Sequence, residues 1–142
     1  MNPMQQFTRP IPFADHLGIR LLSKGGGSAR LELDLRPELL NSWQSAHGGV
    51  TMTLLDIVMA VAARTRDEKA LSASTVEMKV SFLAPANGRL VADGHCIHLG
   101  KSLAFCEGEA RDADGKLVAK SSGTFMLRRD RGAAEDTLPG KA

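Results

Sequence analysis

The fold is decided by residues 50–63, which read VTMTLLDIVMAVAA and are apolar on nearly every face of a helix. A helix of this kind has to be buried. Its one charged residue is Asp56, and no Lys or Arg inside the run neutralises it. Burial of an unpaired carboxylate is costly. We therefore expect Asp56 either to be held by a polar partner, such as Thr53 one turn back, or to take part in chemistry.

The segment just before this helix, residues 41–49, reads NSWQSAHGG. Two adjacent glycines, Gly48 and Gly49, stand where the helix begins and leave their backbone N–H groups unobstructed. These donors, together with the positive end of the helix dipole, suit a developing oxyanion. Oxyanion donors close in sequence to a buried carboxylate indicate acyl transfer.

Alternating apolar and polar residues predict an antiparallel sheet around that helix. Leu31, Leu33 and Leu35 alternate with charged residues, and an apolar row from Val76 to Phe82 alternates with polar ones. Further strands are expected within residues 19–22, 88–99, 102–112 and 116–127, with turns at 25–27, 85–88 and 112–115 and a short helix at 12–18. The predicted class is α+β: a curved, mostly antiparallel sheet wrapped around one long central helix.

Length and composition favour one domain. The 142 residues suffice for a single core, which we place at residues 13–128, after an N-terminal extension (1–12) and before a solvated tail (129–142). A net charge of +2 with interspersed signs and only 4% aromatic residues argue against nucleic-acid binding. The first residues lack the apolar core of a signal peptide, and no apolar stretch approaches the length of a membrane span, so we expect a cytoplasmic protein without a membrane partner.

Neither a metal nor a cofactor is expected. Cys96 and Cys106 are interpreted as small buried hydrophobic residues. Strand alternation would place only Cys96 and His98 on one face, which leaves His95 on the other and no second ligand pair nearby. Residues 112–115 are explained by a two-stranded turn rather than a calcium loop.

The set of Asn41, His47-Gly48-Gly49 and an acid, Asp56, eight residues after the first of those glycines resembles the motif of the PaaI-like (phenylacetate-pathway type) acyl-CoA thioesterases of the hotdog fold. The resemblance covers about residues 13–127. It includes STVEMKVSFLAPA at 74–86 and GKLVAKSSGTF at 115–125. One departure is Gln44, where many relatives carry glycine, and this position bears on the path of the loop and on the acyl pocket.

The resemblance implies a role for each matching catalytic residue. The amide of Gly48 would polarise the thioester carbonyl, with Asn41 and His47 shaping the loop around it. Asp56 would act as general base or as nucleophile, two routes that the sequence leaves open. Thr75 matches a family Ser/Thr that orients the attacking water.

Substrate contacts are expected in two places. Gly49, Gln44 and the apolar side chains of Met52, Leu55 and Met59 are candidates for the acyl pocket. The resemblance adds Gly100, Lys101 and Ser102 near the CoA moiety. Two other functions stay open: a hotdog dehydratase or hydratase, and a non-catalytic acyl-CoA sensor.

Helix geometry adds an expectation about assembly. Eight residues separate Gly48 from Asp56, which places their backbones about 12 Å apart along one helix. One chain cannot present both to one carbonyl. Two antiparallel helices across a two-fold axis would, so we expect a homodimer with composite sites. We also expect a dimer of dimers, but helix geometry does not decide between a dimer and a tetramer.

Overall fold

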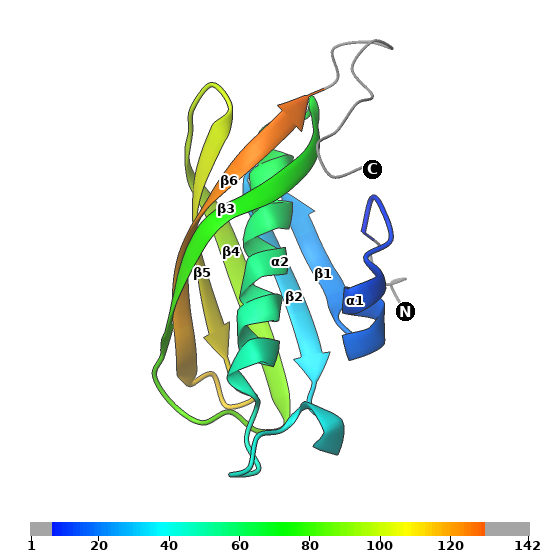
Figure 1. The fold of residues 1–142 in the computed structure, drawn as a ribbon, viewed down its shortest axis with the longest axis vertical. Coiled ribbons are helices and arrows are strands. Elements are labelled where there is room, and N and C mark those ends of the chain that lie inside the picture. The colour runs from blue at the N-terminus through cyan, green and yellow to red at the C-terminus, as the bar shows by residue number, and fades with distance from the viewer. Residues whose placement is uncertain (1–6, 130–142) are drawn as a thin grey trace.

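The computed structural model describes residues 7–129 (Figure 1). The elements are α1 (Pro12–Leu17), β1 (Arg20–Gly25), β2 (Ser28–Asp34), a short 3-10 helix (Pro37–Leu39), α2 (Gly48–Arg66), β3 (Ala70–Phe82), β4 (Arg89–Leu99), β5 (Leu103–Arg111) and β6 (Leu117–Arg129). The expected helices and strands are therefore confirmed. β6 runs one residue into the predicted tail, whose remaining residues lie outside the described part of the chain.

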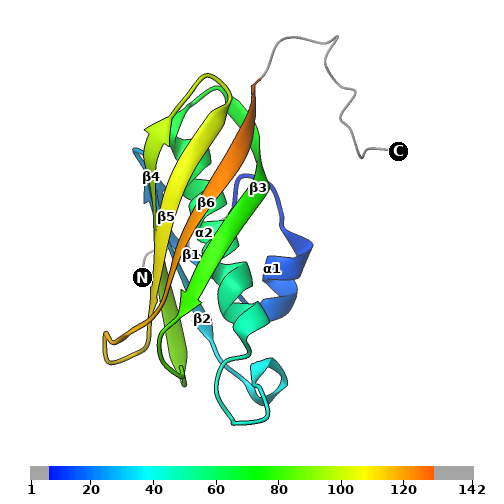
Figure 2. The same ribbon diagram turned by 60° about the vertical axis from the view of Figure 1, so that its left-hand side comes forward.

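The six strands form one sheet in the order β1-β2-β4-β5-β6-β3, and each neighbouring pair is antiparallel. The sheet curves around α2, as Figures 1 and 2 show from two sides. This confirms the predicted α+β arrangement. β1 and β3 are the edge strands, so each is paired on one side only within the described chain.

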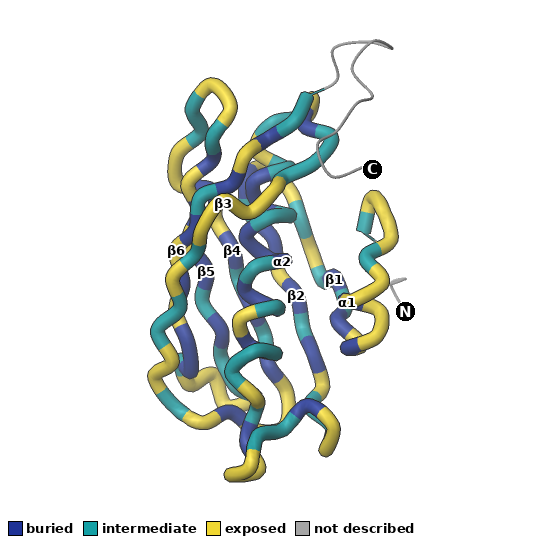
Figure 3. The backbone as a smooth tube through the Cα atoms, in the orientation of Figure 1, coloured by how far each residue is buried: buried dark blue, intermediate teal, exposed yellow. Residues whose placement is uncertain are grey.

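α2 packs one face into the hollow of the sheet (Figure 3). Leu54, Leu55, Val58 and Met59 have no exposed surface, and burial of each such side chain contributes about 1.5–3 kcal/mol. The helix lies so close to β4 that a Cβ on Gly94 would stand 2.6 Å from the carbonyl oxygen of Val58. Only glycine allows this approach.

The opposite face of α2 is not covered, which corrects the expectation that the whole helix is buried. Met52 is 44% exposed and Asp56 is half-buried, because the sheet encloses the helix from one side. By length and composition alone, this 19-residue helix is apolar enough to cross a membrane. The prediction that no stretch approaches that length is therefore wrong; a core helix passes the same test.

Two β-bulges change the faces that alternation predicts. In β3 the register shifts between Thr75 and Glu77, so Thr75 faces the helix, whereas Val76 is 55% exposed. In β4 the register shifts between Cys96 and His98. Cys96 is buried and His98 is exposed, so the prediction that these two share a face is wrong.

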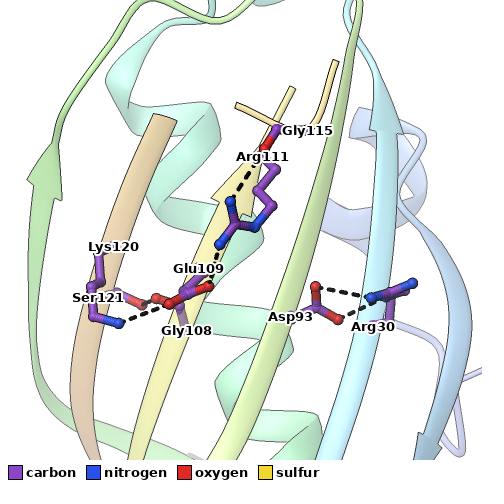
Figure 4. Close-up of polar contacts among 8 residues, drawn as sticks. All are labelled: Arg30, Asp93, Gly108, Glu109, Arg111, Gly115, Lys120 and Ser121. Carbon is purple, nitrogen blue, oxygen red and sulfur yellow. Dashed lines mark hydrogen bonds and ion pairs between the residues drawn. The ribbon is translucent and has the colours of Figure 1, made fainter. Parts of the chain in front are cut away.

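The outer face of the sheet carries a network of polar contacts (Figure 4). Arg30 Nε lies 2.7 Å from Asp93 Oδ1, and Glu109 accepts hydrogen bonds from Lys120 at 2.8 Å and Arg111 at 3.0 Å. These two cations lower the pKa of Glu109. Exposed pairs of this kind add little stability. The outer face of the sheet is therefore a solvated surface.

Among residues 7–129, no three His, Cys, Asp or Glu side chains come together as metal ligands.

Candidate active site

The loop before α2 is held from inside by Asn41. Its Oδ1 accepts hydrogen bonds from the backbone N–H groups of Trp43 (2.8 Å) and Ser45 (3.2 Å), and its Nδ2 donates to Ser45 Oγ at 3.1 Å. A bridge between Leu40 and Ala46 closes the loop. Ser45 is buried, and the sequence interpretation missed it because a lone serine in a loop carries no distinctive signal.

Gln44 has a φ of 62°, and no other residue besides glycines has a positive φ in the described chain. This is the position at which the family resemblance leads us to expect glycine. The left-handed conformation costs a non-glycine residue about 1–2 kcal/mol. The loop therefore has the left-handed backbone conformation that glycine favours, although Gln44 stands at this position. The Gln44 side chain is exposed.

His47 caps α2 and uses one of the two expected oxyanion donors. Its Nδ1 accepts a hydrogen bond of 2.9 Å from the N–H of Gly49, and a Cβ on Gly49 would stand 3.1 Å from that nitrogen. The N–H of Gly48 has no hydrogen-bond acceptor recorded among the described residues. Gly48 lines a cavity of about 460 Å³ with Asn41 and Trp43. Of the two amides, only that of Gly48 is available to an oxyanion.

Asp56 and Thr75 meet in a second cavity, of about 540 Å³. Thr75 Oγ1 donates a 2.6 Å hydrogen bond to Asp56 Oδ1. Thr53, considered above as the holder of Asp56, instead donates to the carbonyl of Gly49 at 2.7 Å. The pairing across α2 and β3 leaves the second carboxylate oxygen of Asp56 without a recorded protein donor in residues 7–129.

The two cavities share no lining residue. One contains Asn41 and Gly48. The other contains Thr75 of β3 and Asp56, which lies eight residues after Gly48 in α2. Within a single chain the predicted site residues therefore lie in two separate cavities.

The remaining predicted substrate contacts lie elsewhere. Leu55 and Met59 are fully buried under the sheet, where Ser121 Oγ lies 3.4 Å from Met59 Sδ. This corrects their assignment to the acyl pocket, because a side chain without exposed surface cannot touch a substrate in this conformation. Met52 is exposed on the open face of α2.

The segment 100–102 forms the turn between β4 and β5. The Gly100 N–H donates to the Leu103 carbonyl at 2.7 Å, the Ser102 carbonyl accepts from Leu127 N–H at 2.8 Å, and the Lys101 carbonyl accepts from Arg129. Lys101 is exposed. None of these residues lines either of the two cavities.

One residue of the second cavity escaped the sequence interpretation. Arg64 lines it together with Arg9 and Lys24, and its Nε is buried without a hydrogen-bond partner. Arg64 and Arg66 both read as ordinary cations at the C-terminal end of a helix. Only the fold distinguishes the inward one from the exposed one.

Comparison with known proteins agrees with this architecture. A family model described as the thioesterase superfamily matches residues 44–119. A protein of Saccharolobus solfataricus named as a candidate esterase is 31% identical over 81% of this chain and 82% of its own length. Human acyl-coenzyme A thioesterase 13 is 31% identical over 77% of this chain and 79% of its own.

Among solved structures, the PaaI protein of E. coli, from the phenylacetic acid degradation operon, is 28% identical, with a TM-score of 0.76 over 85% of this chain and 86% of that one. The sheet wrapped around α2 and these similarities define a hotdog-fold enzyme. The chain belongs to the thioesterase superfamily.

Proposed function

We propose that this enzyme hydrolyses acyl-CoA thioesters to a carboxylic acid and free CoA, at sites shared between two copies of the chain. The observation that carries the proposal is the pair of separate half-sites, one with a free amide at Gly48 and the other with the Asp56–Thr75 pair. Thioester hydrolysis is the reaction of its superfamily. The name of the human relative supports acyl-CoA as the substrate class.

Two antiparallel α2 helices would bring the half-sites together. Met52 lies midway between Gly48 and Asp56 in sequence and is 44% exposed on the uncovered face of the helix. With a two-fold axis passing at Met52, residues equally far before and after it face one another. Gly48 of one copy then lies opposite Asp56 of the other, and the dimer contains two complete sites.

The free edge of β3 supports the same assembly. β3 is a 13-residue edge strand, and its residues 74–77 are exposed. Long unpaired edges are liable to pair with other chains. Pairing of β3 with β3 of a second copy would continue the sheet and bring the two helices together on the same side. A further apolar patch on the outer face, formed by Ile97, Phe105 and Met126, supports association of two such dimers.

In this site the thioester carbonyl oxygen accepts a hydrogen bond from Gly48 N–H, which stabilises negative charge on that oxygen in the transition state. Asp56 of the other copy either removes a proton from water, which adds to the carbonyl carbon, or adds to that carbon itself to form an anhydride that water then opens. In both routes the C–S bond breaks and the CoA thiolate takes up a proton. Thr75 holds the carboxylate in position.

A thiol-release assay on a panel of acyl-CoA esters tests the proposal. We expect Asp56→Asn to lower kcat by at least about 10²-fold without loss of fold, whereas Asp114→Asn, in an exposed turn, leaves it unchanged. Near-native turnover by a folded Asp56→Asn protein would contradict the proposed role. Absence of hydrolysis across the panel would contradict the function.

A further inference from the structure

The cavity beside Asp56, here called the α2 channel, extends along α2 and is lined by both apolar and polar side chains. Asp56, Ala60 and Arg64 line it from one face of the helix, at intervals of four residues. Ile57 and Val61 of α2, Leu71 and Ala73 of β3, and Phe7 and Ile11 before α1 also line it. The small side chain of Ala60 leaves space between the carboxylate and the arginine. The volume is about 540 Å³, within the range of small-molecule sites.

The end of this channel away from Asp56 is cationic. Arg64, Arg9 and Lys24 all line it, and the acids that line it are Asp56 and Glu68. Neither acid makes a recorded ion pair with Arg64, and Lys24 Nζ donates to Thr8 Oγ1 at 2.7 Å. Arg64 Nε is buried with no partner among the described residues. Burial, and to a smaller extent the like charge of Arg9, lower the pKa of the Arg64 guanidinium.

Arg64 is half-buried, and a buried Nε–H without an acceptor is costly. A carboxylate ligand removes that cost by a charge-assisted hydrogen bond. We propose that Arg64, supported by Arg9, binds a distal carboxylate on the acyl chain. The preferred substrates are then acyl-CoA esters of dicarboxylic acids. This inference rests on the proposed hydrolysis at Asp56, since the thioester end of the chain is placed there.

The geometry limits the length of that chain. Asp56 and Arg64 are eight residues apart, about 12 Å along the helix axis. The Arg64 side chain leans toward the N-terminal end of α2, which shortens the gap. An acyl chain of medium length spans it. The apolar walls suit methylene groups, whereas the phosphates of CoA are strongly hydrated and belong at the surface.

The test compares suberyl-CoA with octanoyl-CoA, two esters with the same number of acyl carbons that differ in the terminal carboxylate. We expect the wild-type protein to favour suberyl-CoA by about tenfold or more in kcat/KM, the factor of one charge-assisted hydrogen bond. Arg64→Met should remove this preference with little change toward octanoyl-CoA, and Arg64→Lys should retain part of it. The control is Arg66→Met, which deletes an exposed charge outside the cavity and should keep the preference.

Pantetheine esters show whether Arg64 binds the acyl chain or the phosphates of CoA. If Arg64→Met slows both CoA esters equally but leaves the corresponding pantetheine esters unchanged, Arg64 binds the CoA phosphates and the inference is wrong. Hydrolysis of both esters without any effect of Arg64→Met also overturns it and leaves the thioesterase proposal intact.

Calorimetric binding of octanoate and of octanol provides a readout independent of turnover. Octanoate should bind the wild-type protein at least about tenfold more tightly than octanol, and Arg64→Met should remove the difference. Binding of this kind without hydrolysis of any ester would overturn the proposed function and leave the anion site standing. Equal binding of octanoate and octanol would overturn the anion site.

Discussion

Replacement of Thr75 by Val removes the hydroxyl that holds Asp56 and changes little else. Thr75 Oγ1 donates to Asp56 Oδ1 at 2.6 Å, and Val has a similar shape and suits a strand. A hydrogen bond to a charged group contributes about 1.5–3 kcal/mol. Thr75 is exposed in the single chain, so the lower value applies, and about 1.5 kcal/mol corresponds to about tenfold in kcat.

The assay is steady-state thiol release with the best acyl-CoA substrate. Because Thr75 positions the carboxylate and not the acyl group, kcat should fall while KM stays near its wild-type value. Thr75→Ser keeps the hydroxyl and should restore most of the activity. A folded Thr75→Val protein with wild-type kcat would refute the positioning role, and a rise in KM alone would assign Thr75 to substrate binding.

Three further predictions concern the loop, the axis and the thiols. Gln44→Gly should change the free energy of unfolding by less than about 1 kcal/mol, because relief of the positive φ is opposed by the entropy of glycine. Gln44→Val should have a lower free energy of unfolding than Gln44→Gly, because a β-branched residue is strained at a positive φ. A Gln44→Val protein that is more stable than Gln44→Gly in urea titrations would contradict this. Met52→Cys should give an active, disulfide-linked dimer on mild oxidation. If the protein stays monomeric on oxidation, the two-fold axis does not pass at Met52. Burial raises the pKa of the Cys106 thiol to about 12, so Cys106→Ser and Cys96→Ser should keep turnover; acyl labelling of either thiol would indicate a different nucleophile.

The regular parts of this fold could be predicted because they follow local periodicity. The alternation of leucines in β2 and the glycines in the turns at 25–27 and 112–115 determined those elements correctly. The bulges at Val76 and Ile97 could not be predicted, since an extra residue in a strand leaves no mark on composition. They decide that Thr75 faces the helix and that His98 leaves the face of Cys96.

The site was predictable to the extent that its residues cluster in sequence. Asn41, His47 and Gly48 fall within one segment, and Asp56 is the one acid of an apolar helix. Thr75 was proposed only from the resemblance to a known family. The capture of the Gly49 amide by His47 depends on a side-chain rotamer, and the cationic cavity around Arg64 depends on a contact with residues 7–11. Neither long-range packing nor rotamers can be read from residue types.

The central claim is that each active site combines Gly48 of one copy with Asp56 and Thr75 of the other. Subunit exchange between two inactive proteins, Asn41→Ala and Asp56→Ala, tests it most directly. In each mixed dimer one site carries both defects and the other carries neither. With random exchange about half of the dimers are mixed, so about a quarter of wild-type activity should return.

A matched control uses two defects in the same half-site. Mixing Asp56→Ala with Thr75→Ala should give no activity beyond the residual activity of the sites that lack only Thr75, because Asp56 and Thr75 of one site come from one chain and every mixed dimer then has a defect in both sites. Recovery of about a quarter of wild-type activity for the first pair and none beyond that residual activity for the second is the predicted result. No recovery for the first pair, with mixed dimers demonstrated by mass spectrometry, would contradict the composite site and place the whole reaction within one chain.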